Sequence, residues 1–110
     1  MARFFIFCIL FIFVPFSLNA ALYKGQEEFV NACVGCHETR QHFIVTKNKK
    51  EWRELIENGG EKLAQIHLDS FNAKDSHDYF KSKIFIENSR HLMQFLMEYA
   101  KDSGNVPACN

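Results

Sequence analysis

Over much of the chain, apolar residues recur with the period of an amphipathic helix. Two amphipathic helices are predicted in the first half, at residues 24–33 and 49–58, because their apolar side chains recur three and four positions apart. Asn48 is the expected N-cap of the second helix, and Gly59 and Gly60 are expected to end it. The apolar positions are Phe29, Val30 and Cys33 in the first helix and Trp52, Leu55 and Ile56 in the second.

The second half continues the helical pattern after the glycine pair. Residues 61–68 predict a third helix, and a last helix carries Leu92, Phe95, Leu96 and Tyr99 inward and stops before Gly104. Its start is ambiguous between Asp78 and Ser89. Residues 38–48 show no clear period and are expected to be a loop, although 42–45 has some strand character, and residues 69–76 are polar and loop-like. The fold class is therefore all-α, with about four helices joined by short connections.

The first twenty residues differ from the rest and have the composition of a secretory signal peptide. One basic residue, Arg3, precedes an uncharged apolar run from Phe4 to Phe16, and small residues then lead to Ala20. The run is shorter than the roughly 18–20 residues that a membrane-spanning helix needs. We therefore expect residues 1–20 to be a signal peptide, with an uncleaved anchor as the alternative, and residues 21–110 to be the mature domain, without a membrane span.

The charge of the mature domain does not favour a charged partner. The 110-residue chain has 13 basic and 13 acidic residues, and losing Arg3 leaves 12 against 13, a net charge of −1. The mature domain lacks the excess of basic residues that would indicate binding to nucleic acid or to a membrane surface. A domain of this size has a small core and often needs a metal, a disulfide or a cofactor for stability. Three cysteines remain after the signal, Cys33, Cys36 and Cys109, and an odd number argues against a simple disulfide framework.

The segment Cys33-Val34-Gly35-Cys36-His37 contains the C-x-x-C-H spacing that attaches c-type haem. In that chemistry the two thiols bond to the porphyrin and the histidine binds the iron. An export signal strengthens this interpretation, because covalent haem attachment in bacteria takes place outside the cytoplasm.

Other interpretations of the same cysteines remain. A thioredoxin-like redox pair would need strands around the motif, and the pattern is nearly strand-free. A zinc site could use Cys33, Cys36, His37 and His42, but structural zinc sites usually place the second ligand pair a dozen or more residues away. Free thiols in a chance match are the third alternative.

Both ends of the mature chain resemble the class I cytochromes c. The segment with Gly25, Phe29 and the C-x-x-C-H motif resembles the first helix of that family, and His91-Leu92-Met93-Gln94-Phe95-Leu96 resembles the last. The resemblance implies a small helical bundle around one covalently bound haem c, held by Cys33 and Cys36, with His37 as the proximal iron ligand. It also implies that Gly25 permits close packing of Phe95 where the helices cross, and that Trp52 contacts a haem propionate.

The family's methionine ligand has no counterpart in the loop before the last helix. His77 and His67 remain as candidates for the distal iron ligand. His42 lies too close to His37 in sequence to reach the opposite face, His91 is expected to face solvent, and Met93 and Met97 are more typical of helix packing. Four phenylalanines are expected in the haem pocket and core: Phe43, Phe71, Phe80 and Phe85.

The resulting hypothesis is a periplasmic, monomeric electron-transfer protein of a respiratory chain, which exchanges single electrons with partner proteins. No acid/base pair or nucleophile arrangement indicates an enzyme. The alternative is a haem-based ligand-binding or sensing module with an open sixth iron position.

Overall fold

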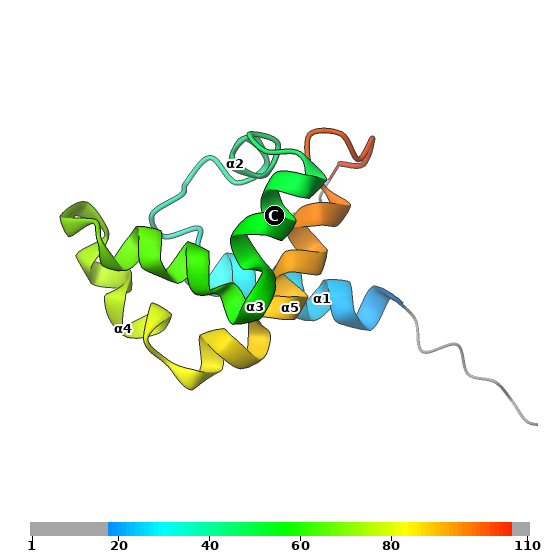
Figure 1. The fold of residues 1–110 in the computed structure, drawn as a ribbon. Helices are drawn as coiled ribbons and strands as arrows, with labels where there is room; N and C mark the ends of the chain where they lie inside the picture. Colours follow the sequence, from blue (N-terminus) through cyan, green and yellow to red (C-terminus); the bar gives the residue numbers. More distant parts are fainter. Residues whose placement is uncertain (1–17, 107–110) are drawn as a thin grey trace, which may run out of the picture.

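A computed structural model describes residues 18–106, and every regular element in that range is helical. The elements are α1 Leu18–Ala32, α2 Gln41–Ile44, α3 Lys49–Leu68, the 3-10 helix η1 Phe71–Ser76, α4 His77–Phe80 and α5 Lys83–Glu98 (Figure 1). The predicted all-α class is confirmed, with five α-helices instead of about four. The predicted signal peptide lies outside the described residues except for its last three positions, and Cys109 lies outside them entirely.

The helices α1 and α5 cross where the sequence predicts a close approach (Figure 1). A Cβ added to Gly25 would lie 2.6 Å from the Cβ of Phe95 and would collide with the carbonyl oxygen of His91. Only a glycine permits backbones to pack at this distance. Below the crossing, the rings of Phe29 and Phe95 pack with centroids 5.6 Å apart.

The long helix α3 is broken in the middle, as the glycine pair predicts. Asn58, Gly59 and Gly60 have φ values of 56°, 71° and 75°, which is the left-handed region that glycine and asparagine tolerate best. A Cβ on Gly60 would overlap the ring of Phe85 on α5, so this glycine also permits close packing. The N-terminus of α3 has the predicted cap, because the Asn48 side chain accepts a hydrogen bond from the Glu51 N–H.

The core is formed by apolar residues of every α-helix. Trp52 is buried and its indole N–H donates to the carbonyl oxygen of Ile44 at 2.9 Å, which fixes α2 against α3. Burial of this apolar surface is the main stabilising term of such a domain. The fully buried large side chains are Trp52, Phe29, Phe85, Phe95, Ile44, Ile56, Leu92 and Leu96.

Three short elements occur in or beside stretches whose pattern predicted loops. The α2 turn forms within 38–48, and η1 lies within 69–76. Neither Asp78 nor Ser89 begins the last helix: α5 begins at Lys83, because the Ser82 side chain caps it by accepting from the Phe85 N–H. Helix α4 is a separate single turn before it. No helix in residues 18–106 has the length and apolar character to cross a membrane.

Candidate functional site

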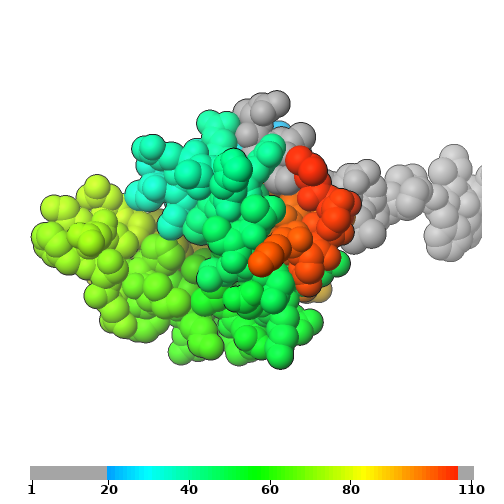
Figure 2. Space-filling view, turned by 90° about the horizontal axis from the view of Figure 1, so that it is seen from above, coloured from blue at the N-terminus to red at the C-terminus, as the bar shows by residue number. Residues whose placement is uncertain are grey.

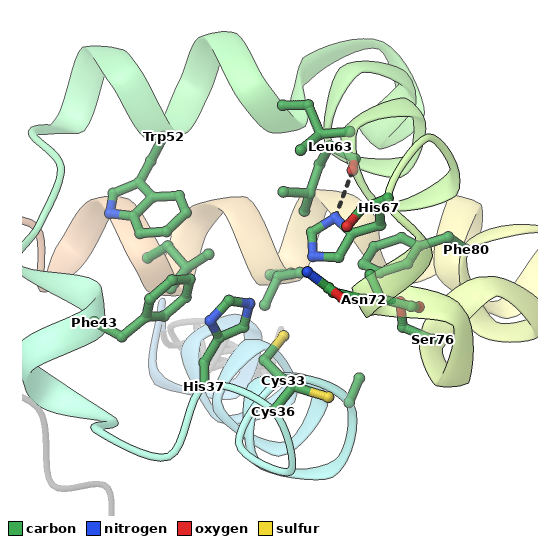
Figure 3. Close-up of a pocket in the computed structure, with 16 residues that line it drawn as sticks. Cys33, Cys36, His37, Phe43, Trp52, Leu63, His67, Asn72, Ser76 and Phe80 are labelled. Carbon is green, nitrogen blue, oxygen red and sulfur yellow. Dashed lines mark hydrogen bonds between the residues drawn. The ribbon is translucent and has the colours of Figure 1, made fainter.

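A cavity of about 290 Å³ opens between the end of α1, the second half of α3 and the segment that contains η1 and α4. Cys33, Cys36, His37 and His67 all contribute to its lining (Figure 3). Most other lining side chains are apolar, among them Phe43, Leu63, Ile66, Phe80, Leu92 and Leu96. Viewed from above, residues 70–80 form one end of the molecule, away from residues 100–106 (Figure 2). The predicted site residues of the motif therefore lie together on one apolar cavity.

The cysteines and His37 are brought together by a tight turn that continues α1. The Cys33 N–H donates to the Phe29 carbonyl at 2.9 Å, and the Cys33 carbonyl accepts from the His37 N–H at 2.8 Å. Both thiols are free, with Cys33 half-buried and Cys36 exposed. The turn presents the two sulfur atoms and the His37 ring on the same side, below the cavity as drawn in Figure 3.

The environment of Cys33 does not suit a reactive thiolate. Desolvation, followed by the negative charge of Glu28 and the neighbouring Cys36, raises the pKa of the Cys33 thiol to about 12. Redox-active C-x-x-C pairs instead have a lowered thiol pKa. Together with the absence of strands among residues 18–106, this argues against the thioredoxin-like alternative.

The rings of His37 and His67 face the same space from opposite walls. Their centroids lie 6.2 Å apart and their planes are nearly perpendicular, at 85°. Two imidazole nitrogens that bind one metal ion from opposite sides place the ring centroids about 6 Å apart, because each metal–nitrogen bond is about 2.0–2.1 Å. The pKa of His37 is lowered by desolvation and then by His67, which favours the neutral form that metals bind. The centroid separation therefore matches that of two imidazoles bound to one metal ion.

The second nitrogen of His67 is already held by the protein. Its Nδ1 lies 2.7 Å from the carbonyl oxygen of Leu63, one turn earlier in α3. A carbonyl can only accept, so Nδ1 carries the proton, and Nε2 is left as the basic nitrogen on the cavity side (Figure 3). Metal-binding histidines usually donate their other N–H in this way. The ring of Phe80 stacks on His67 at 4.1 Å and restricts its rotation.

His37 is supported by a ring stack of the same kind. Phe43 packs parallel to the His37 ring at a centroid distance of 4.0 Å. The predicted pocket or core positions of Phe43, Phe80 and Phe85 are confirmed, the first two on the cavity and the third in the core. Phe71 is an exception: it is 79% exposed, because its place at the start of η1 turns it toward solvent.

His77, the second candidate for the distal position, does not line the cavity. Its Nε2 lies 2.8 Å from the carbonyl oxygen of His67 and 3.0 Å from that of Ser70. Neither Met93 nor Met97 lines the cavity, and both are half-buried against the core. His91 was expected to face solvent, but its Nδ1 is buried and has no hydrogen-bond partner within the described range.

Trp52 lies on the cavity wall but has a different hydrogen bond from the one that the family resemblance implies. Its N–H is used by the Ile44 carbonyl, which leaves no indole donor for a carboxylate. The polar lining instead comes from Ser70, Asn72 and Ser76. No pattern in the sequence predicts these three residues as part of a site, because they lie in a polar stretch without a helical period.

The zinc alternative would require four ligands in one place. His42 is exposed on α2, and residues 18–106 contain no group of three or more histidine, cysteine or acidic side chains arranged to hold a metal ion. The described arrangement is instead one imidazole pair with two thiols at its edge.

Comparisons with known proteins identify no relative of this chain. No family model matches the chain, and no curated protein or solved structure matches it significantly. The resemblance to the class I cytochromes c thus rests on the residues that carry it.

Proposed function

We propose that the protein is an exported electron carrier with one covalently attached haem c. Cys33 and Cys36 hold the haem, His37 is the proximal iron ligand and His67 is the distal ligand. The observation that carries this proposal is the pair of imidazoles 6.2 Å apart across an apolar cavity, with both thiols of the motif on its wall.

The haem iron supplies the chemistry, since it takes up and releases one electron. The chain's own residues attach and orient it. Cys33 and Cys36 would hold it through thioether bonds; adding S–H across a vinyl group would place sulfur on one carbon and hydrogen on the other, so no oxidant would be needed. The high pKa of Cys33 has no consequence after attachment, because a thioether has no proton to lose.

The protein sets the properties of the iron through the two imidazoles and the apolar wall. Donation from His67 Nδ1–H to the Leu63 carbonyl fixes the tautomer and the orientation of the ring. Two histidine ligands give a lower reduction potential than histidine with methionine. Phe43 and Phe80 each cover one face of an imidazole ring and reduce its contact with water, which also affects the potential. With two histidine ligands and an apolar cavity wall, we expect the carrier to be low-spin and to have a low reduction potential.

The wider role is a periplasmic carrier in a respiratory chain that exchanges electrons with partner proteins, without catalysis of its own. The nearly balanced charge of the mature chain supports a protein partner instead of nucleic acid.

The test is the absorption and EPR spectra of the protein produced in a host with haem-maturation machinery. The unmodified protein is expected to be low-spin, and His67→Ala should convert the ferric iron to high-spin while the haem stays attached. His42→Ala is the matched control, because His42 is exposed and should leave the spectrum unchanged. Rapid CO binding by the reduced, unmodified protein would contradict a closed sixth position and favour the ligand-binding alternative.

A further inference from the structure

The imidazole of His77 is placed at the junction of three elements. It is half-buried at the first position of α4, and its Nε2 lies within hydrogen-bond distance of the carbonyl oxygens of His67 and Ser70. Both partners can only accept, so Nε2 carries a proton and donates to the two oxygens.

These two carbonyls belong to the part of the chain that supports the distal side of the cavity. His67 lies in the last turn of α3, and its carbonyl oxygen also accepts from the Ser70 N–H at 3.1 Å, just outside the helix. Ser70 is the N-cap of η1, and Ser70, Asn72 and Ser76 line the cavity. The His77 imidazole therefore adds a second link between the main chain of His67 and the cavity wall.

The same residue also connects to the ring that packs on His67. His77 begins the single turn of α4 that ends at Phe80, and Phe80 stacks on the His67 ring at 4.1 Å. Loss of the His77 hydrogen bonds would loosen both the backbone under His67 and the helix that restricts its ring.

We infer that His77 is a positioning residue that keeps His67 on the iron and so limits access of outside ligands to the sixth position. This inference rests on the proposed function, in which His67 is the distal ligand. The residue does not touch the iron: it acts through the main chain of His67.

The experiment measures cyanide binding to the ferric protein and CO binding to the ferrous protein, together with the spin state at rest. His77→Ala is expected to stay mainly low-spin and to bind cyanide and CO roughly fivefold faster, the factor that one lost hydrogen bond of ordinary strength gives. His77→Gln retains an N–H donor and should return the rates toward those of the unmodified protein. Asp78→Ala, an exposed neighbour, is the control and should change nothing.

Unchanged binding rates in His77→Ala would overturn the inference. So would a fully high-spin iron in both His77→Ala and His77→Gln, because His77 would then be the ligand itself. If His77→Ala does not accumulate, His77→Asn, whose donor is shorter, should give intermediate rates, and rates equal to the unmodified protein would refute the inference. Failure of the proposed function gives a different result: neither the unmodified protein nor any of the variants would contain attached haem.

Discussion

Two regions of the molecule differ in what holds them together. In the crossing region, formed by Gly25 and Phe29 of α1 and Phe95 of α5, side chains and backbones are in direct contact and buried. The pocket region, formed by residues 33–43 and 63–80, surrounds a cavity of about 290 Å³. Its parts are joined by single hydrogen bonds and by ring stacks. We expect direct packing to stabilise the first region, whereas the cavity interrupts the packing of the second and a bound group would be needed to complete it.

The largest expected effect is at the crossing, in Gly25→Ala. The new Cβ would overlap the His91 carbonyl and the Phe95 side chain, and such overpacking outweighs the gain in helix preference. We expect a net loss of about 2 kcal/mol in the free energy of unfolding, measured by urea denaturation. Gly35→Ala is the control, because a Cβ at Gly35 meets no atom within 4 Å. Equal stability of the two variants would mean that the helices do not cross at Gly25.

The next effect sharpens the contrast between the regions. A Cys33→Ala/Cys36→Ala variant cannot attach haem, and hydrogen exchange should then be at least about tenfold faster in residues 63–80 than in the loaded protein, because a bound group stabilises the parts that contact it. Exchange at the core of α5 should change less. Equal acceleration in both regions would contradict the distinction drawn between them.

A smaller effect is expected in Trp52→Phe, which lies between the regions. The substitution leaves the Ile44 carbonyl without its donor and should cost about 1 kcal/mol of unfolding free energy. The reduction potential should hardly change, since the N–H is not aimed at the cavity. A large shift in potential with unchanged stability would instead restore the propionate contact that the family resemblance implies.

The smallest effect concerns pH and the hydrogen bond from the Tyr79 hydroxyl to Glu28, which joins α4 to α1. Desolvation, then the hydrogen bond and charge of Glu28, raise the pKa of Tyr79 above its ordinary value of 10.0. The unfolded chain therefore loses this proton first, and the folded protein loses stability as pH rises above about 10.

The free energy of unfolding should fall with pH by well below about 1.4 kcal/mol per pH unit, the limit for one proton, because the phenol is only partly buried. Tyr79→Phe should flatten the fall in stability between pH 10 and 11, with little change in its slope near neutral pH. Thermal unfolding at a series of pH values measures this effect. If stability falls equally steeply at alkaline pH in both proteins, the fall is due to groups other than Tyr79.

Much of the fold could be predicted from the sequence because its signals are local. The period of apolar residues predicted the part of α1 from residue 24 onward, both halves of α3 and the inner face of α5, but not the start of α1 at Leu18. Two adjacent glycines predicted the break at Gly59. The short elements were missed because α2, η1 and α4 have too few residues to show a period. Their conformation is set by contacts made elsewhere, such as Trp52 with Ile44.

The candidate site divides in the same way. The motif residues Cys33, Cys36 and His37 lie within five positions, so their spacing alone placed them together. The opposite wall of the cavity includes residues 67–80, which lie 30 to 43 positions after His37, and no spacing rule distinguishes His67 from His77. What separates them is three-dimensional: Nδ1 of His67 has a carbonyl partner and its other nitrogen faces the cavity, whereas Nε2 of His77 is bonded away from it.

The most direct measurement is the intact mass of the protein after export from a host that matures c-type cytochromes. The account predicts the mass of the polypeptide plus one haem, retained under denaturing, acidic extraction, and loss of that addition in Cys33→Ala/Cys36→Ala. A bare polypeptide mass, from cells that load a control cytochrome fully, would contradict it.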